Sequence, residues 1–543
     1  MFMPQLTPGF VNSHSVGAPY QPDPLALFQH LSAKTSNTLL LESAEISDKR
    51  ALKSLILVDP AVKIECHGQE VSIAAKSKNG EAVIAFLQQR FAAPKFNKDV
   101  TFKASSNDFL KLSFAEQTQP LDELSRLKSN NPMQVLREIQ SLDAIEEHPF
   151  AIFLGGIFAF DLISLAEELP TVKDSDNVCP DYVFYLAETL LIIDHKQQTT
   201  EILANVFSGS NQQQCQQSLL QQIEYLQSLC ATPYLFARLD LSLTETQPKA
   251  KEDISDLEFC QQVDSLKEHI LAGDIFQVVP SRTFSLPCTD PIKAYQALKQ
   301  TNPSPYMFYI KDDNFVLFGA SPESALKFTQ KTRQVELYPI AGTRGRGFKD
   351  NGEYNLDLDG RIELELRNDE KEKAEHLMLV DLARNDIARV SKGGTRHVAE
   401  LLKVDRYSHV MHLVSRVCGS LSDDLDALHA YQACMNMGTL SGAPKVKATE
   451  LIRKIEGKRR GSYGGAVGYL NGDGDMDTCI VIRSAFVKSS IAHVQAGAGV
   501  VFDSTPQAEA DETRQKAQAV IKAIQIANQA KNQLLATYDN GEQ

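Results

Sequence analysis

A chain of 543 residues is too long to fold around a single hydrophobic core, so its length predicts two or more domains. Its 43% hydrophobic and 23% charged residues are typical of a globular protein with a core in each domain. The formal net charge of −14 argues against nucleic acid as the main ligand, because nucleic-acid-binding proteins normally carry a basic face.

The N-terminal residues suggest neither export nor membrane insertion. MFMPQLTPGFVNSHSVG lacks a basic segment and a long apolar run, so we expect a cytoplasmic protein with a flexible stretch over residues 1–20. AIFLGGIFAF at 151–160 is shorter than the ~20 residues that a membrane-spanning helix needs, and it predicts a buried strand. Nine scattered cysteines without a C-x-x-C pair indicate neither a disulfide framework nor a zinc site.

Residues 21–245 mix short strand-like runs with helical ones, which predicts an α+β N-terminal domain. SLILVDPAVKIEC (54–66) and YVFYLAETLLIID (182–194) have the pattern of strands. The glutamine-rich segment at 211–229 is open to interpretation as low-complexity sequence, but Leu219, Ile223 and Leu226 fall on one helical face and favour a helix. The polar stretch at 247–257 marks a domain boundary.

A second domain is predicted over residues 257–530, followed by a flexible tail at 531–543. It starts with a helix near Phe259 that stops at Gly273, and continues with alternating runs that predict antiparallel strands. NGDGD at 471–475 predicts a hairpin turn. The last element is a long helix, capped by Ser504 or Thr505 with Pro506 in its first turn.

Two pairs of glutamates stand at helical spacing in this second domain. In DEKEKAEHLMLVDLARND (369–386), Glu372 and Glu375 share one face, and the apolar residues predicted on the buried side are Ala374, Leu377, Met378 and Leu382. In AEADETRQK (508–516), Glu509, Glu512 and Lys516 share a face. Each pair alone fits a solvated helix face, but two pairs of oxygen ligands without His or Cys suit Mg²⁺. Spacing alone does not bring the helices together.

Other segments place small or charged residues in unusual settings. The side chains are minimal at Gly497, Ala498 and Gly499, so backbone amides there could approach an anion closely. Glycines within a strand pattern more often mark a β-bulge. PIAGTRGRG (339–347) predicts a loop that carries two arginines. Arg483 lies in an otherwise apolar strand and needs a carboxylate from the protein or a ligand. His412 lies among apolar neighbours, where a core histidine is the commoner explanation.

Ten motifs in order make the chain resemble the chorismate-utilising enzymes from about residue 20 to 530. They are DIFQVVPSR, GASPES, PIAGTR, EHLMLVDLARND, VMHLVS, MGTLSGAPK, GSYGGAVGY, CIVIRS, QAGAGVV and EADETRQKA. The resemblance implies an α+β fold of antiparallel β-sheets packed against outer helices, with an N-terminal α+β regulatory domain.

The resemblance also implies roles for individual residues. Glu375 and Glu512 correspond to direct Mg²⁺ ligands, and Glu372 and Glu509 to ligands that act through water. The groups implied to hold the two carboxylates of chorismate are Gly342, Thr343, Tyr463, Arg483, Gly497, Ala498, Gly499 and Lys516. Four residues are implied to be catalytic. Glu323 corresponds to the general acid and His412 to a group concerned with proton removal, and the other two are Gln277 and Thr439.

Two positions favour the anthranilate-forming members of the family, which add ammonia at C2 of chorismate and eliminate pyruvate. Members that add water resemble one another in having a lysine where this chain has Gln277. Aminodeoxychorismate synthases typically read PIKGT, and this chain has Ala341 at the lysine position. The alternatives are an aminodeoxychorismate synthase and a non-catalytic tryptophan-binding paralogue. Gly345 stands where relatives often have proline.

The resemblance extends to regulation and assembly. Ser43 in LLLESAEI and Pro305, Tyr306 and Met307 in NPSPYMFY are similar to the family's tryptophan feedback site. No glutamine amidotransferase portion is recognisable, so we expect ammonia from a separate glutaminase subunit. A heterotetramer with two copies of each subunit is the implied assembly. Neither nucleic acid nor a membrane is an expected partner.

Overall fold

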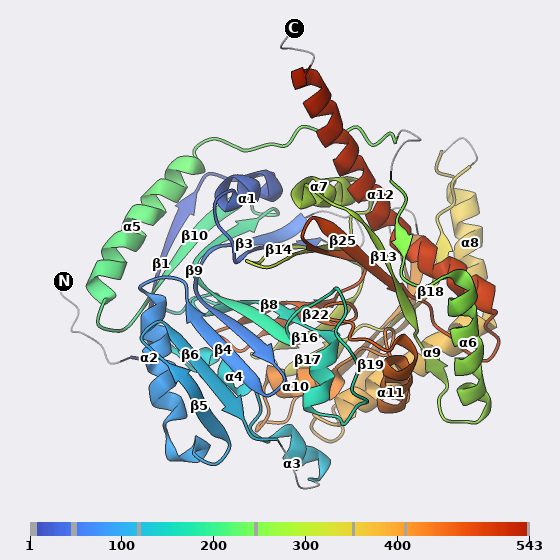
Figure 1. Cartoon of the computed structure of the whole chain (residues 1–543), viewed down its shortest axis with the longest axis horizontal. Coiled ribbons are helices and arrows are strands. Elements are labelled where there is room, and N and C mark those ends of the chain that lie inside the picture. Colours follow the sequence, from blue (N-terminus) through green and yellow to red (C-terminus); the bar gives the residue numbers. More distant parts are fainter. Residues whose placement is uncertain are drawn as a thin grey trace.

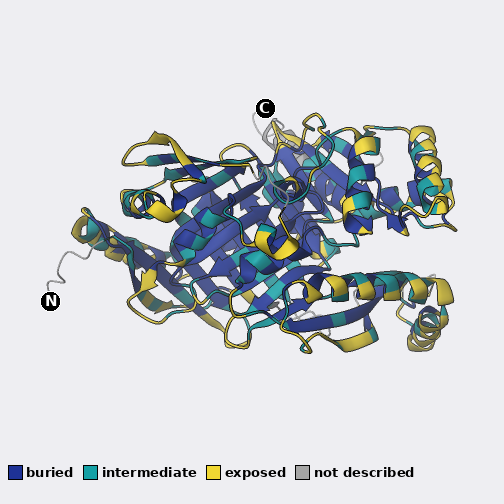
Figure 2. Cartoon of the chain, turned by 90° about the horizontal axis from the view of Figure 1, so that it is seen from below, coloured by how far each residue is buried: buried dark blue, intermediate teal, exposed yellow. Residues whose placement is uncertain are grey.

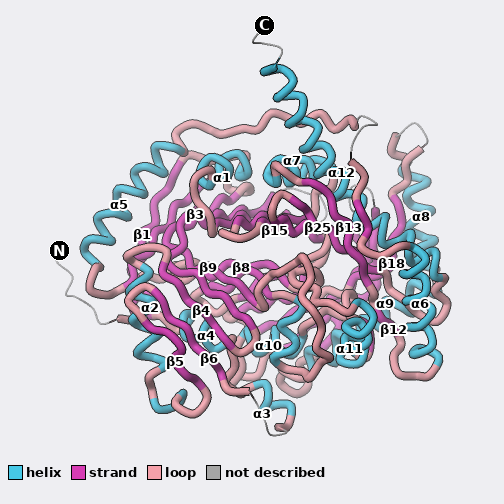
Figure 3. Tube along the Cα trace, viewed as in Figure 1, coloured by secondary structure: helices cyan, strands magenta, loops and turns pink. Residues whose placement is uncertain are grey.

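The computed structural model describes residues 8–44, 51–116, 121–243, 248–349, 353–406 and 410–539, without the side chains of residues 51 and 531–539. Antiparallel strands occupy the centre of the molecule and helices lie around them (Figures 1 and 3). The predicted α+β class is therefore confirmed. In the described part of the chain, no helix is long and apolar enough to cross a membrane.

The N-terminal half contains ten strands, five α-helices and two short 3-10 helices (Pro94–Phe96 and Phe160–Leu165) among its described residues. The strands are β1 Phe10–Ala18, β2 Thr38–Ala44, β3 Ala51–His67, β4 Glu70–Ala75, β5 Val100–Ser105, β6 Phe109–Phe114, β7 Asp143–Ala144, β8 Phe153–Phe158, β9 Tyr182–Asp194 and β10 Thr199–Phe207. The helices are α1 Pro24–Ser32, α2 Gly80–Phe91, α3 Glu123–Leu127, α4 Gln134–Gln140 and α5 Gln212–Leu229.

The C-terminal half begins with the two-residue strand β11 Lys251–Glu252. Its other strands are β12 Gln277–Val278, β13 Ser281–Pro287, β14 Tyr306–Lys311, β15 Val316–Ser321, β16 Ser324–Thr329, β17 Gln334–Leu337, β18 Ile340–Gly345, β19 His397–Arg406, β20 Val410–Ser420, β21 Gly442–Ala443, β22 Ala466–Asn471, β23 Met476–Ile480, β24 Ser484–Lys488 and β25 Ile491–Gly497. Its helices are α6 Asp256–Leu271, α7 Pro291–Thr301, α8 Leu356–Asn368, α9 Glu370–Ala388, α10 Ala427–Cys434, α11 Lys445–Glu456 and α12 Pro506–Asp539.

Strands from the two halves pair with each other at two places. β2 pairs with β14, with Ser43 opposite Tyr306, and β8 pairs with β22, with Phe158 opposite Ala466. Between these pairings, apolar residues that include Leu57, Val183 and Phe308 form a buried core cluster. Most of the strand surface is buried, whereas the outer helices carry exposed residues on their outward faces (Figure 2). The two halves therefore share one hydrogen-bonded framework.

The run predicted as a buried strand forms β8, which is buried along its whole length. Its two glycines allow close packing, because a Cβ on Gly156 would lie 2.1 Å from the backbone oxygen of Val183. The glutamine-rich segment forms α5, with Leu219, Ile223 and Leu226 buried as predicted. A capping box between Ser255 and Glu258 starts α6, three residues before the predicted start.

Several local predictions were wrong. Residues 10–18 form β1, paired with β10 over eight residues, because Ser13 is buried and donates a hydrogen bond to Asn205 (2.7 Å). The helix α12 continues to Asp539, beyond the predicted end at residue 530. PIAGTRGRG contains the strand β18 rather than a loop, with a bulge at Gly342, whose φ is +78°. Arg483 lies between β23 and β24 with a φ of +49° and not inside a strand.

Candidate active site

The helix α9 presents the first glutamate pair. Asp369 caps it by accepting a hydrogen bond from the backbone N–H of Glu372 (3.0 Å). Its buried residues are His376, Leu379, Val380, Ala383, Asp386 and Ile387, whereas Ala374 and Leu377 are exposed and Met378 and Leu382 only partly buried, which corrects the predicted buried side. The apolar run therefore packs on β18 and β20 through a face rotated from the predicted one, because tertiary packing decides which side a helix buries.

The helix α12 brings its carboxylates close to the glutamate pair of α9. Burial raises the pKa of Glu375, and the charges of Glu372 and Glu512 raise it further. Arg344 of β18 binds Glu372 through one guanidinium nitrogen and Asp369 through the other, both at 2.7 Å. The charges of α9 and α12 therefore interact, which sequence spacing alone left open.

Glu509, Glu512 and Lys516 form a linked group at the start of α12. Lys516 Nζ lies 2.6 Å from Glu512 Oε1 and donates a hydrogen bond to the Gly497 carbonyl (3.1 Å). Burial raises the pKa of Glu509, and the neighbouring charge of Glu512 adds to that increase. The pKa of Glu512 is lowered because the attraction of Lys516 outweighs the effect of burial. Glu512 is thus the more acidic carboxyl of this pair.

The chemistry of these side chains fits a hard divalent cation. In the described ranges, no three His, Cys, Asp or Glu side chains are gathered as a ready metal centre. The donors from α9 and α12 are nevertheless all carboxylate oxygens, and the buried Oε2 of Glu509 has no hydrogen-bond partner in the described structure. A cation between the two helices would relieve the repulsion that raises the pKa of Glu375.

Gln277 links a small two-stranded sheet to this acidic group. It lies on β12, paired with Ala443 of β21, and its amide donates to Glu375 Oε1 (2.9 Å). Gly499 lies alongside, since a Cβ at that position would lie 2.9 Å from Gln277 Nε2 and 3.5 Å from Glu375 Oε1. Gly499 therefore keeps the space beside Glu375 open.

Arg483 and Tyr463 add a cation and a phenol to the same region. Burial lowers the pKa of Arg483, while attraction to Tyr463, Glu512 and Glu323 opposes that shift. Burial raises the pKa of Tyr463 to about 12, and a Cβ on Gly497 would lie 3.1 Å from its hydroxyl. Ala498 is different from its two glycine neighbours, because its side chain is buried and its N–H donates to the Pro280 carbonyl (3.1 Å). Its amide is consequently already used within the protein.

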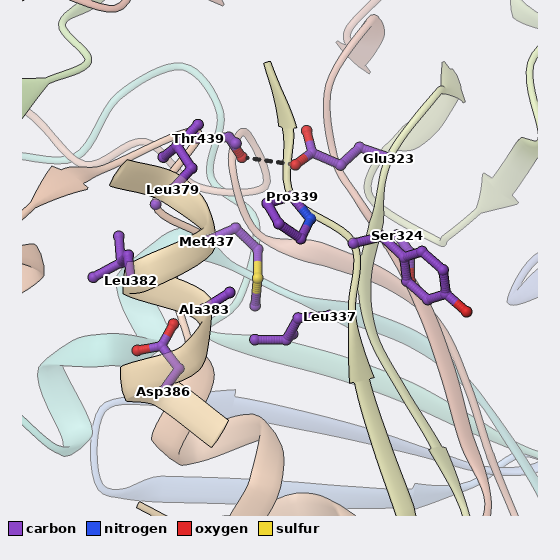
Figure 4. A pocket seen from close by; sticks show the side chains of 12 residues that line it. Glu323, Ser324, Leu337, Pro339, Leu379, Leu382, Ala383, Asp386, Met437 and Thr439 are labelled. Carbon is purple, nitrogen blue, oxygen red and sulfur yellow. Dashed lines mark hydrogen bonds between the residues drawn. The ribbon is translucent and has the colours of Figure 1, made fainter. Parts of the chain in front are cut away.

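Glu323 and Thr439 are joined by a hydrogen bond. Glu323 lies in the turn between β15 and β16, and its Oε1 accepts a bond from the Thr439 hydroxyl (3.0 Å). Figure 4 shows this pair at one end of a cavity of about 30 Å³, with Asp386 of α9 at the other end. Burial raises the pKa of Glu323 to about 8, although Thr439, Lys516 and Arg483 act in the opposite direction. At neutral pH this carboxyl is therefore largely protonated.

His412 and Thr343 face each other across the β18–β20 pair. The Thr343 hydroxyl lies 2.9 Å from Nδ1 of His412, and the two residues are register partners. Burial, with the charges of Arg483 and Lys516, lowers the pKa of His412 to about 4. The imidazole is therefore neutral at physiological pH. Gly342 lies at the bulge beside Thr343, where a Cβ would come within 3.2 Å of Glu372 Oε2.

A second cavity, of about 340 Å³, lies where the two halves pair. Ser43 of β2 and Tyr306 and Met307 of β14 line it. Pro305 is not among the lining residues, and its carbonyl accepts a hydrogen bond from the Ala44 N–H (2.9 Å). The other lining side chains include aromatic, basic and acidic groups: Phe150, Tyr469, Lys53, Lys196, Glu42, Asp194 and Asp477. The predicted feedback residues are thus brought together, apart from the catalytic candidates.

Sequence reasoning missed three features of these sites. The pairing of Arg344 with Glu372, the bond between Thr439 and Glu323, and the presence of Asp477 in the larger cavity all depend on contacts between distant segments. Asp477 is half-buried beside Tyr306, whose hydroxyl donates to it (3.3 Å), and desolvation in the cavity wall raises its pKa to about 6. A lone acid inside the strand-like run MDTCIVI was the one signal available in the sequence.

Residues 81–522 match the family described as chorismate binding enzyme. Proteins named anthranilate synthase component 1 from Vibrio parahaemolyticus and Escherichia coli are 56% and 53% identical to this chain. The alignments cover 94% of this chain in both cases, and 92% and 96% of the two relatives.

Solved structures show the same relationship. Anthranilate synthase component I from Streptococcus pneumoniae is 31% identical, with a TM-score of 0.67 over 87% of this chain and 92% of that one. The menaquinone-specific isochorismate synthase of Escherichia coli shares the fold at 17% identity, with a TM-score of 0.61 over 96% of each chain. The predicted resemblance is confirmed: the chain belongs to the family of chorismate-binding enzymes.

Proposed function

We propose that this chain converts chorismate and ammonia to anthranilate and pyruvate, the first committed step of tryptophan biosynthesis. The named relatives of more than 50% identity favour this member of the family over those that add water. Gln277 supports the same assignment, because its amide donates to Glu375 and supplies no basic group to activate water.

The observation that carries the proposal is the buried, protonated carboxyl of Glu323 next to two cationic side chains. A general acid must hold its proton at the working pH, and a pKa of about 8 meets that condition. Arg483 and Lys516 lie close enough for their charges to act on Glu323, and they suit the two carboxylates of chorismate. An acidic protein thus offers a local positive site to a dianion.

The reaction would proceed in two steps. Ammonia forms a bond to C2 while the C4–O bond breaks, and Glu323 donates its proton so that the hydroxyl leaves as water. In the second step C2 loses its hydrogen as a proton, and the electron pair of that C–H bond completes the aromatic ring as the bond between C3 and the enolpyruvyl oxygen breaks. The group leaves as enolpyruvate, which takes up a proton at its methylene carbon to become pyruvate. His412 is neutral and oriented by the contact of its Nδ1 with the Thr343 hydroxyl, and a neutral imidazole suits proton removal from C2.

Glu375 and Glu512 are the proposed direct ligands of Mg²⁺, with Glu372 and Glu509 acting through water. When bound, the ion would orient the substrate and neutralise its charge as a Lewis acid. Gly342, Thr343, Tyr463 and the 497–499 segment would position the carboxylates, with Ala498 contributing through its backbone shape, since its amide is already bonded.

We assign the larger cavity to feedback inhibition by tryptophan. Its aromatic lining suits an indole, and its acidic and basic groups suit the ammonium and carboxylate of a free amino acid. Residues 21–245 would then form the regulatory domain and residues 257–530 the catalytic domain, with the inhibitor held by Ser43, Pro305, Tyr306 and Met307 at their junction.

Ammonia would come from a separate glutamine amidotransferase subunit, in a heterotetramer with two copies of each chain. The direct test of the function uses this chain alone with chorismate, Mg²⁺ and an ammonium salt, followed by anthranilate fluorescence. We expect anthranilate to form, to require Mg²⁺ and to be suppressed by tryptophan. A product of another mass would assign the chain to another member of the family, and no product would favour a binding protein.

A further inference from the structure

A fully buried arginine lies on the strand β13, outside the set of residues that the proposed reaction uses. Arg282 has no exposed surface, and Phe259 and Phe284 flank its guanidinium with ring centres 5.2 and 5.3 Å away. A buried guanidinium costs free energy unless its charge and its donors are satisfied. The groups that satisfy it are therefore held in fixed positions around it.

The guanidinium of Arg282 joins two helices. Its Nη1 lies 2.8 Å from Asp256 Oδ1, in the first turn of α6. On α12, its Nε donates to Thr513 Oγ1 and its Nη2 donates to the Ala510 carbonyl, both at 2.9 Å. The Thr513 hydroxyl donates to the same carbonyl (2.7 Å), and both α12 residues are fully buried. One planar fork therefore holds α12 at two neighbouring points.

These two contacts lie at the turn of α12 that carries its proposed metal ligands. Ala510 directly follows Glu509, and Thr513 directly follows Glu512. At about 100° per residue, the two contact residues occupy the helix flank next to the acidic face. A rotation of α12 about its axis would break both hydrogen bonds to the arginine as it turned the two glutamates away from α9.

The strand that carries Arg282 also borders the segment proposed to hold the substrate. β13 pairs with β25, with Arg282 opposite Ala496 and Ser281 opposite Gly497. From the helix, Lys516 donates a hydrogen bond to the Gly497 carbonyl (3.1 Å). The helix and the strand pair are therefore joined at two places, at Arg282 and at Lys516.

We propose that Arg282 is a positioning residue for the α12 half of the magnesium site. It holds Glu509 and Glu512 toward the glutamate pair of α9 without being a ligand itself. This role rests on the proposed function, because it concerns the ligands assigned there. Groups that orient metal ligands from outside typically contribute roughly 10–100-fold to metal affinity.

Arg282→Lys and Thr513→Val test this role from the two ends of one contact. The lysine keeps the positive charge beside Asp256, but a single ammonium cannot reproduce the fixed fork that reaches both helices. The valine has nearly the shape of threonine and lacks the hydroxyl. In calorimetric titrations with MgCl₂, we expect Kd to rise about tenfold or more in Arg282→Lys and about threefold in Thr513→Val.

A purely structural role of Arg282 would give a different result. Loss of folded protein lowers the number of binding sites per chain that calorimetry counts, whereas misplaced ligands raise Kd at an unchanged number of sites. In assays with chorismate and ammonium, Arg282→Lys should need more Mg²⁺, and excess Mg²⁺ should restore kcat to within about threefold of wild type.

Arg453→Lys is the matched control, because it makes the same change at another buried arginine. Arg453 is 8% exposed, and its guanidinium donates to Asp161 Oδ1 (2.8 Å) and to the Pro170 carbonyl (3.2 Å), neither of which belongs to α12. We expect this variant to lose unfolding free energy, as Arg282→Lys does, but to keep the wild-type Kd for Mg²⁺.

Three outcomes would overturn the role proposed for Arg282. They are an unchanged Kd in both Arg282→Lys and Thr513→Val, an equal rise of Kd in Arg453→Lys, and a wild-type chain that binds no Mg²⁺. If Arg282→Lys does not fold, Thr513→Val decides the case. A wild-type chain that binds Mg²⁺ but forms no anthranilate would instead reject the proposed function, and the Kd values would still decide the role of Arg282.

Discussion

Two acidic groups, one around Glu456 and one around Glu375, differ in what neutralises their charge. Glu456 and Arg460 are each 1% exposed, with Arg460 Nη2 2.6 Å from Glu456 Oε1, and Arg460 also donates to the carbonyls of Leu440 and Val279. Glu375 instead faces Glu372 and Glu512. The first group is completed by the protein, whereas the second leaves charge for a ligand to neutralise. The comparison separates charges that hold the fold from charges that serve chemistry.

Glu323→Gln should have the largest effect on chemistry. The amide keeps the shape but has no acidic proton to give, so we expect kcat to fall about 10³-fold, within the usual contribution of a general acid. In wild type, the rate should fall as pH rises through about 8, where the Glu323 carboxyl loses its proton. A pH–rate profile of both proteins measures this. Thr439→Val, which removes the hydrogen bond to Glu323 but leaves its carboxyl, should shift the pH dependence without abolishing activity.

The same variant should have a higher unfolding free energy than wild type at high pH. The folded pKa of Glu323, about 8, is above its ordinary 4.5, so the folded state binds more protons between these values, and the carboxyl costs stability as pH rises through this window. Glu323→Gln should match wild type near pH 4 and exceed it at pH 9 by on the order of 2–4 kcal/mol. Denaturant unfolding at the two pH values checks this, and an equal difference at both would contradict the assigned pKa.

Glu456→Gln tests the other acidic group and should have a comparably large effect on stability, of the opposite sign. Removing the carboxylate leaves the buried Arg460 uncompensated, which typically costs about 3–5 kcal/mol of unfolding free energy. The residue also accepts hydrogen bonds from the N–H and hydroxyl of Ser281 (2.9 and 2.8 Å), so the loss extends to the neighbouring strand. Urea unfolding measures it, and a loss below about 1 kcal/mol would mean that the pair contributes little to the fold.

Glu375→Gln should affect ligand binding more than stability. The change removes a proposed metal ligand and also removes repulsion from Glu372 and Glu512. We expect the affinity for Mg²⁺ to fall roughly 10–100-fold, while the unfolding free energy without metal stays equal or rises slightly. Calorimetric titration with MgCl₂ and a melting curve without it give the two readings. Glu370→Gln, on the same helix but outside the site, is the control.

The contrast between the two acidic groups also shows what a sequence can predict. Apolar runs in the sequence were enough to predict β8, β9 and α5, because each of these elements follows a local pattern. The predicted buried side of α9 was wrong, because packing against β18 and β20, which are formed by other segments of the chain, determines which face of the helix is buried. The role of the two glutamate pairs as a metal site stays a prediction. Their electrostatic interaction and the ion pair between Arg344 and Glu372 depend on contacts between distant segments and could not be read from spacing.

Ser43→Phe should have the smallest effect on the enzyme and the clearest effect on its control. Ser43 lines the larger cavity, and its partner in the β2–β14 pair is Tyr306, so a phenyl ring there would project into the space that we assign to the indole of tryptophan. We expect the concentration of tryptophan that halves activity to rise at least tenfold, with kcat for ammonium within about twofold of wild type. Ser36→Phe, which lies outside the cavity, is the control. Unchanged tryptophan sensitivity would remove Ser43 from the inhibitor site. A parallel loss of activity would mean that the cavity and the catalytic residues are coupled even without inhibitor.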